Sequence, residues 1–445
     1  MKETPNICLV HCHDLGQYLG CYGVDIETPR IDQLASEGAL FENHFTTAPQ
    51  CSPSRASLMT GRHPHENGLM GLAHGAWELH DEERVLPQYL SEAGYDTHLF
   101  GLQHVTEYTD RLGYDAIHSK GILSPDAPAA IHEVDRAREV SDGFATTLSG
   151  GDLDSPFFAS IGFFELHRME NDDGMFVFSD DRYEAADPED VDPLPYLPDD
   201  PAIRHDLAEM YGMVRAIDDA VGTILDALDA AGLDDTLVLF TTEHGLAMPG
   251  AKGSVRDPGI EGALLVRHPD LIEAGARYDE LVSNIDVLPT ILDLLSESIP
   301  DCLSGRSFHP LLADDEYTPR ERLFSGMTWH DTYNPMRAVR TERFKYIRNF
   351  WCLPEVYLTN DVSHSPSGAV VKNEFDRPSR PYEQLFDLEA DPHERENVVS
   401  DPNCEEVVAD LREQLHDWMR STEDPLLDGP VPPGDFEEIM GWPPN

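Results

Sequence analysis

Basic residues are scarce in this chain of 445 residues: 31 lysines and arginines face 84 aspartates and glutamates, which gives a formal net charge of −53. A surface of this charge repels phosphate groups, so we expect neither nucleic acid nor an anionic membrane as a partner. The acidic residues are spread along the whole chain and do not form a tail. A spread excess is typical of a surface adapted to high salt, where screening weakens self-repulsion. We therefore expect a protein from a halophilic organism.

Long apolar runs are also missing. No stretch of about 18 apolar residues is present, which predicts no membrane span. The first residues, MKETPNICLVHCHD, lack the apolar segment of a secretory signal. The seven cysteines suggest no disulfide framework, and the spacing of Cys8, Cys12 and Cys21 matches no zinc pattern. We expect a cytoplasmic protein with reduced thiols.

Short apolar runs alternate with longer amphipathic runs over the first part of the chain. Apolar residues recur with helical spacing over residues 205–232, and buried strands are predicted at residues 7–10, 157–164, 236–240 and 262–269. Strands separated by helices favour a mostly parallel sheet that is covered by helices on both faces. We therefore predict an α/β catalytic domain over residues 1–315.

The pattern changes after about residue 315. The runs at residues 336–350 and 382–394 alternate like the strands of hairpins, and residues 404–422 have the spacing of an amphipathic helix. These runs predict a smaller C-terminal antiparallel α+β subdomain over residues 316–445.

Polar side chains follow the predicted strands at the points where the strands end. The four endings are His11-Cys12-His13-Asp14, Gly101-Leu102-Gln103-His104, Glu165-Leu166-His167-Arg168 and Thr242-Glu243-His244. Ligands of open α/β sheets bind outside the carboxyl ends of the strands. Any one of these histidines could be a hydrogen-bonded loop residue, but four such endings predict a metal and acid–base site.

The stretch APQCSPSRASLMTGRHPHENG, residues 48–68, resembles the sulfatase signature Cys-x-Pro-Ser-Arg followed by Thr-Gly. The matching residues are Cys51, Pro53, Ser54, Arg55, Thr60 and Gly61. TLVLFTTEHG and EQLFDLEADPHERENV extend the resemblance over nearly the whole chain, and GLQHV, NPMRAVRTERFKYIRNF and DWMRSTEDP resemble the sulfamidase branch of that family. The resemblance implies an alkaline-phosphatase-like α/β fold with a small C-terminal subdomain.

The resemblance also implies an activity: metal-dependent hydrolysis of a sulfate ester or sulfamate, expected on a sugar. It implies that a formylglycine-generating enzyme converts Cys51 to formylglycine (3-oxoalanine). One hydroxyl of the hydrated aldehyde then attacks sulfur, and the other expels sulfate as the aldehyde re-forms. The catalytic residues implied are Cys51, Arg55, His104, His167 and Lys252, and the metal ligands implied are His13, Asp14, residue 51, Glu243 and His244.

Three positions depart from the family pattern. His13 stands where an aspartate is usual, Glu243-His244 replaces Asp-Asn or Asp-His, and Leu102 replaces a lysine. The family implies one divalent cation, calcium, but imidazole ligands favour manganese or zinc. The missing lysine removes one positive charge from the expected sulfate pocket.

The segment GMTWHDTYNPMR, residues 326–337, is expected by resemblance at the junction of the two predicted domains. Trp329 offers an apolar face for a sugar ring, and His330 and Arg337 offer hydrogen-bond donors for its polar groups. The alternative places Trp329 in the subdomain core and Arg337 in an internal ion pair.

Two other functions remain open at the level of sequence. One is hydrolysis of phosphonate or phosphate diesters on the same scaffold, because related phosphonate hydrolases also use formylglycine and an Asp-His metal pair. The other is a homologue whose site has decayed. The sequence leaves the oligomeric state open.

Overall fold

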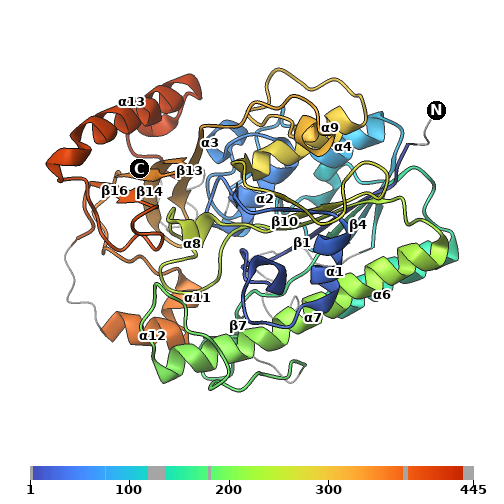
Figure 1. Cartoon of the computed structure of the whole chain (residues 1–445), viewed down its shortest axis with the longest axis horizontal. Helices are drawn as coiled ribbons and strands as arrows, with labels where there is room; N and C mark the ends of the chain where they lie inside the picture. Colours follow the sequence, from blue (N-terminus) through green and yellow to red (C-terminus); the bar gives the residue numbers. More distant parts are fainter. Residues whose placement is uncertain (1–3, 76, 119–135, 179–181, 374–378, 434–445) are drawn as a thin grey trace, which may run out of the picture.

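The computed structural model describes residues 4–75, 77–118, 136–178, 182–373 and 379–433 (Figure 1). Its main sheet has eight strands in the order β11-β2-β10-β9-β1-β6-β4-β5. In chain order these strands are β1 (Ile7–Cys12), β2 (Ala39–Phe41), β4 (Asp96–Gly101), β5 (Ala116–Ile117), β6 (Phe157–Gly162), β9 (Leu237–Thr242), β10 (Leu264–Arg267) and β11 (Ala276–Tyr278).

The centre of this sheet is parallel. Strand β1 pairs in parallel with β6 on one side and with β9 on the other, and β4 extends the parallel run beyond β6. Strand β10 runs antiparallel to both β9 and β2. All six residues of β1 are buried, as a strand covered on both faces requires. The prediction of a mostly parallel α/β sheet is confirmed.

Helices cover both faces of the sheet, and alternate residues of β1 contribute to each core (Figure 1). Cys8 and Val10 belong to the core built by α1 (Pro29–Glu37), α6 (Ala137–Gly150) and α7 (Pro201–Ala231). Ile7 and Leu9 belong to the opposite core, built by α2 (Cys51–Thr60), α4 (Leu86–Glu92) and α9 (Val287–Leu294). This alternation follows from the two-residue period of a strand.

A second sheet lies at one end of the molecule (Figure 1, left). Its four strands are antiparallel and follow chain order: β13 (Arg322–Trp329), β14 (Tyr333–Thr341), β15 (Phe344–Asn349) and β16 (Glu383–Asp387). Helix α13 (Glu405–Ser421) packs against β14 and β15 through Leu411, Leu415 and Trp418. The predicted smaller antiparallel C-terminal sheet with a following helix is thus confirmed.

The remaining described elements are short. They are η1 (Gly20–Tyr22), β3 (His44–Phe45), α3 (Pro64–Asn67), η2 (Ala73–Gly75), η3 (Thr109–Leu112), β7 (Met169–Glu170), β8 (Phe176–Val177), α8 (Asp257–Ile260), β12 (Val282–Ser283), η4 (Asn284–Asp286), α10 (His309–Leu312), α11 (Asn360–Ser363), α12 (Pro366–Asn373), η5 (Pro402–Cys404) and η6 (Pro425–Leu427). Within the described ranges, none of the helices has the length and apolar character needed to span a bilayer.

Candidate active site and metal centre

The ends of β1 and β9 bring four ligand-type side chains together. Because the two strands pair in parallel up to Cys12 and Thr242, the residues that follow them leave the sheet side by side. His13 Nδ1 lies 2.5 Å from Glu243 Oε1, and His244 Nε2 lies 3.1 Å from Asp14 Oδ1 and 3.3 Å from Glu243 Oε1. All four side chains are buried.

Helix α2 presents Cys51 to this cluster from its first turn. The preceding Gln50 is extended, so the chain turns into the helix at Cys51 itself. The thiol is 2% exposed and its Sγ lies 3.6 Å from His244 Nε2. Ser54 donates a hydrogen bond to the backbone carbonyl of Glu243, and Asn284 donates to the carbonyl of Ser54 at 3.0 Å. The first bond connects the start of α2 to the residue that follows β9, and the second connects it to Asn284.

The donor atoms of this cluster suit a divalent cation. His13, Asp14, Cys51 and Glu243 each offer one ligand atom, and these four atoms lie within 4.8 Å of one another. His13 Nδ1, Asp14 Oδ1 and Glu243 Oε1 are buried, and their close polar contacts with one another and with His244 lack hydrogen-bond geometry. Buried polar atoms without partners are destabilising unless a ligand satisfies them. One imidazole beside two carboxylates fits manganese or zinc better than an all-oxygen set would.

The protonation of two of these side chains favours ligation. Burial lowers the pKa of His13 to about 4, so its ring is neutral at pH 7. Burial alone would raise the pKa of Glu243, but the Arg55 guanidinium and His13 hold that pKa well below 4.5. The cluster therefore presents a neutral imidazole beside an ionised carboxylate.

Arg55 lies one turn beyond Cys51 on α2 and is 2% exposed. Its Nε donates to Glu243 Oε2, and its Nη1 contacts His11 Nδ1. The side chain thus orients a candidate metal ligand while it balances part of the negative charge of the cluster.

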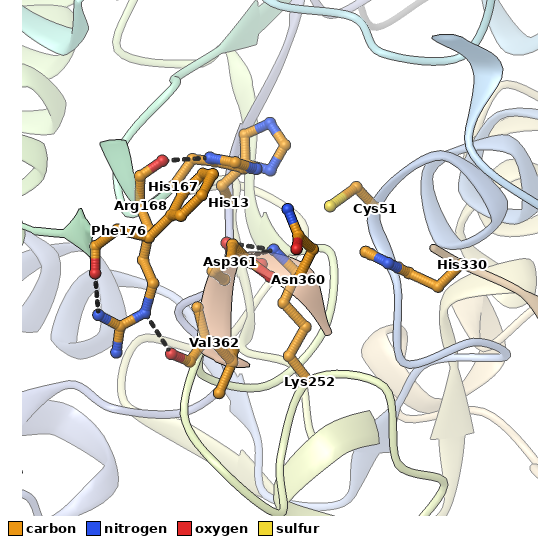
Figure 2. Close-up of polar contacts among 12 residues, drawn as sticks. His13, Cys51, His167, Arg168, Phe176, Lys252, His330, Asn360, Asp361 and Val362 are labelled. Atoms are coloured by element: carbon orange, nitrogen blue, oxygen red, sulfur yellow. Dashed lines mark hydrogen bonds and ion pairs between the residues drawn. The ribbon is translucent and has the colours of Figure 1, made fainter. Parts of the chain in front are cut away.

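A second group of charges adjoins the first (Figure 2). Lys252 Nζ donates to Asp14 Oδ2 at 2.9 Å and to Asp361 Oδ2 at 2.8 Å. Ligand-type atoms of Asp14, His167 and Asp361 lie within 4.8 Å of one another, and the His13 and His167 rings meet edge to face at 5.3 Å. Burial is the largest single effect on the pKa of Lys252 and lowers it. The two carboxylates together outweigh burial, so the pKa lies well above its ordinary value. Lys252 is therefore a charged donor at the edge of the metal cluster.

His104 lies on the other side of the cluster. Its ring centroid is 5.6 Å from that of His13, and His13, Cys51 and His104 offer ligand atoms within 4.8 Å of one another. Leu102, where the family has a lysine, is buried and adds no charge to the site.

The three residues predicted to bind substrate lie in different surroundings. His330 follows β13, its Nδ1 lies 2.9 Å from Asp331 Oδ2, and its side chain is directed toward the group formed by Cys51, Lys252 and Asp361 (Figure 2). Burial raises the pKa of Asp361, but its polar neighbours, Lys252 first among them, outweigh burial and lower it, and His330 is close enough to contribute. The structure thus brings His330 to the site.

Trp329 and Arg337 are not brought to the site. Trp329 Nε1 donates to the carbonyl of Val431 at 2.7 Å, and its ring packs on Tyr333. Arg337 is 2% exposed and donates to both carboxylate oxygens of Asp424, at 2.6 and 3.0 Å. These are the packing and ion-pair contacts of the alternative interpretation, so a direct role in substrate binding does not fit the position of either side chain.

Asp361 is the site residue that the sequence analysis missed. It lies in the four-residue helix α11, in a stretch without motif or periodicity, in a chain with 84 acidic residues. No local sequence signal distinguishes Asp361 from the other aspartates, and its role becomes visible only through its contact with Lys252 in the folded structure.

Two family models match the chain: Sulfatase over residues 5–297, and N-sulphoglucosamine sulphohydrolase, C-terminal, over residues 251–380. Among curated relatives, N-sulphoglucosamine sulphohydrolase of Homo sapiens is 30% identical, covering 96% of this chain and 92% of the relative. An ulvan-active sulfatase of Formosa agariphila is 26% identical, covering 95% of this chain and 76% of the relative.

Solved structures share the fold. A structure in complex with its substrate D-glucosamine-2-N,6-O-disulfate has a TM-score of 0.71 at 19% identity, covering 95% of this chain and 99% of that chain. The phosphonate monoester hydrolase of Agrobacterium radiobacter has a TM-score of 0.70 at 20% identity, covering 94% and 96%.

The fold and the site together define an α/β protein in which a candidate metal centre faces a cysteine at a helix start. The two family models and the human relative identify the family to which this protein belongs, because together they cover most of the chain. The chain belongs to the sulfatase family and is an enzyme of the sulfuric ester hydrolase class. The resemblance carried by the Cys51 signature is thereby confirmed.

Proposed function

We propose that this protein hydrolyses a sulfate ester or sulfamate carried by a saccharide, with Cys51 converted to formylglycine by a formylglycine-generating enzyme. The observation that carries the proposal is the position of Cys51, at the start of α2 and beside the four buried ligand-type side chains. The similarity to a human N-sulphoglucosamine sulphohydrolase supports a saccharide substrate. The acidic composition is the basis of the accompanying proposal of a high-salt setting.

His13, Asp14, Glu243 and His244 would hold the metal together with residue 51. The bound cation would supply a positive charge that polarises a sulfate oxygen and favours the ionised form of the nucleophile. Arg55 keeps Glu243 ionised and in place through its Nε. The buried pocket excludes water, which strengthens each of these electrostatic interactions.

Lys252 and His167 are the proposed ligands of the sulfate group, and His104 is the proposed proton acceptor beside residue 51. Lys252 stays charged because its ammonium group donates hydrogen bonds to the carboxylates of Asp14 and Asp361. Burial lowers the pKa of His167, so its ring is neutral; its Nδ1–H donates to the carbonyl of Arg168 at 2.7 Å, which leaves Nε2 as a hydrogen-bond acceptor at the leaving group. Asp361 positions Lys252 from the C-terminal part of the chain.

The test begins with protein produced together with a formylglycine-generating enzyme. Trypsin releases the peptide of residues 31–55, and its mass reports whether Cys51 has been converted. Turnover is then compared on an aryl sulfate, on glucosamine N-sulfate and on an aryl phosphonate diester. We expect the two sulfur substrates to be preferred; preference for the phosphonate diester would establish the alternative function.

Two controls define the roles of residue 51 and of the metal. Cys51→Ala should abolish turnover and leave the melting temperature nearly unchanged, because one thiol contributes little packing energy. Chelation should remove activity, and manganese or zinc should restore it at least as well as calcium. Full activity after verified metal removal would contradict the metal centre.

A further inference from the structure

We propose that the C-terminal sheet carries a second saccharide subsite, which binds a sugar unit with an anionic group at a distance from residue 51. The subsite is a surface cavity of about 400 Å³ lined by Asn349, Phe350, Trp351, Cys352, Arg380 and Tyr382. Its walls come from the segment that follows β15 and from the residues that lead into β16. That the sugar belongs to the sulfated substrate rests on the proposed function.

The cavity exposes two aromatic rings. Trp351 is 49% exposed and Tyr382 is 58% exposed, although most large apolar side chains of the chain are buried. Tyr333 supports Trp351 edge to face at 5.4 Å, and the Arg348 guanidinium lies over the Tyr382 ring at 3.5 Å. Both rings are therefore held in place before a ligand arrives. Aromatic faces that are half exposed and well supported suit the apolar face of a sugar ring.

Arg380 gives the cavity its preference for an anion. It is 8% exposed; its Nη2 donates to Asn334 Oδ1 at 2.6 Å, and its Nε is buried without a partner. No carboxylate of the described chain forms an ion pair with it, although Glu355 lines the adjoining cavity. Burial lowers its pKa to about 10, so the guanidinium remains charged at pH 7.

Other buried arginines of this chain are neutralised by a carboxylate. Arg168 binds Asp206, Arg337 binds Asp424 and Arg340 binds Asp257, each with a charge-assisted hydrogen bond. A buried cation without a counter-ion is costly. Arg380 departs from this pattern in a chain rich in carboxylates, which is the behaviour of a cation whose partner is a ligand. A carboxylate or sulfate of a sugar supplies the matching planar or forked acceptor.

The subsite shares none of the residues assigned to the candidate active site. Arg380 and Asn349 also line a neighbouring narrow cavity, whose other walls include Gly253 and Ser254, the residues that follow Lys252. In the proposed arrangement, a substrate with its sulfate group at Lys252 carries a further sugar unit on the side of Trp351. The subsite selects oligosaccharides over single sugars.

Binding is measured by calorimetry on protein carrying Cys51→Ala, which needs no turnover. The probes are glucosamine N-sulfate and a sulfated, uronate-containing tetrasaccharide. We expect the tetrasaccharide to bind at least about tenfold more tightly than the monosaccharide, and Trp351→Ala or Arg380→Met to remove about tenfold of that advantage. Arg380→Lys should restore part of it. The matched control is Tyr108→Ala, an exposed aromatic on another part of the surface, 66% exposed, which should change nothing.

Two further arms identify the anion and separate the two proposals. A tetrasaccharide with its carboxyl groups reduced and one with its sulfates removed show which group Arg380 binds. Equal affinity for monosaccharide and tetrasaccharide, or an unchanged tetrasaccharide affinity in the exposed-site variant Trp351→Ala, would overturn the subsite. Turnover of aryl sulfate by the unsubstituted enzyme tests the proposed function alone, so either proposal can fail while the other holds.

Discussion

At the scale of single residues, the pairing of Lys252 with two carboxylates sets the charge of the proposed sulfate pocket. Asp14 follows β1 of the main sheet and Asp361 belongs to the C-terminal part of the chain, and both bind the same ammonium group. Two negative charges therefore face the single positive charge of Lys252 before substrate binds. Removing either carboxylate changes both the position of Lys252 and its net attraction for sulfate.

The kinetics of Asp361→Asn distinguish these two effects. The amide keeps the size of the side chain, but it weakens the hydrogen bond that positions Lys252 and removes a negative charge that repels sulfate. We expect kcat on an aryl sulfate to fall about tenfold, as for the loss of a charge-assisted hydrogen bond, while KM does not rise. Steady-state kinetics against Asp410→Asn, on the exposed face of α13, provide the comparison. A rise in KM at constant kcat would contradict a positioning role.

His330→Ala tests whether the β13–β14 connection selects the sugar. His330 faces the site while its neighbour Trp329 is bonded to Val431. We expect KM for a saccharide substrate to rise about tenfold or more and KM for a small aryl sulfate to change little, because the small substrate uses only the sulfate pocket. Equal losses on both substrates with a lowered melting temperature would mean that His330 supports the structure instead.

At the scale of elements, the strands that carry the site could be predicted because their apolar runs end abruptly in polar residues. β1 and β9 were predictable for this reason, and so was the proximity of His13 to Glu243. The antiparallel direction of β10 and the three-residue edge strands β2 and β11 depend on tertiary pairing, which leaves no local pattern. The burial of Arg337 also depends on a distant partner, Asp424, so the sequence could not decide between its two roles.

One helix start depends on a carboxylate from another helix. Asp218 of α7 accepts hydrogen bonds from the backbone N–H groups of Arg30 and Ile31 in the first turn of α1, at 3.0 and 2.8 Å. Asp218→Ala leaves these donors without a partner and should lower the free energy of unfolding by about 1–2 kcal/mol. Urea unfolding at pH 7.5 measures the effect, with Asp219→Ala, an exposed neighbour on α7, as control. A loss no larger than that of the control would exclude the capping role.

At the scale of the whole molecule, a buried charge cluster joins the main sheet to the C-terminal sheet. Lys345 of β15 and Arg340 of β14 bind Asp257 of α8, and Lys345 Nζ lies 3.4 Å from Glu394 Oε1. Burial raises the pKa of Glu394 and of Glu261 from 4.5 to about 7. Lys345 and Arg256 lower the pKa of Glu394, and Lys345 and Arg340 lower that of Glu261, but burial outweighs these cations.

The contribution of this cluster to the stability of the protein should therefore fall as pH rises through this window. Between pH 4.5 and about 7 the folded state holds protons on these two carboxyl groups that the unfolded chain has lost, so their contribution to the free energy of unfolding decreases with pH there and levels off above it. Glu394→Gln removes part of this dependence, and its stability relative to the unsubstituted protein should increase with pH. Glu396→Gln, on the exposed side of the same segment, is the control. Parallel pH profiles for the two proteins would contradict the assignment.

The net charge of −53 predicts a dependence on salt. Self-repulsion opposes the compact state, and the screening length falls from about 10 Å at 0.1 M to about 3 Å at 1 M ionic strength. We expect the melting temperature to rise steadily with sodium chloride over this range. Calorimetric scans at constant pH measure it, and a melting temperature that is flat or falls with salt would argue against a surface adapted to high salt.

The burial of Cys51 also limits when its proposed conversion to formylglycine could take place. In the folded protein the signature lies in α2, where every residue from Cys51 to Thr60 is buried, and Ser54 is bonded to Glu243. A modifying enzyme that reads this stretch as an extended peptide has no access to it once β9 and α2 have met. The proposed conversion of Cys51 would therefore have to precede folding, and a chain that folds first would remain in a stable but unactivated form. Adding the modifying enzyme to purified, folded protein would come too late, whereas co-synthesis in one cell provides the interval in which the nascent segment is still open.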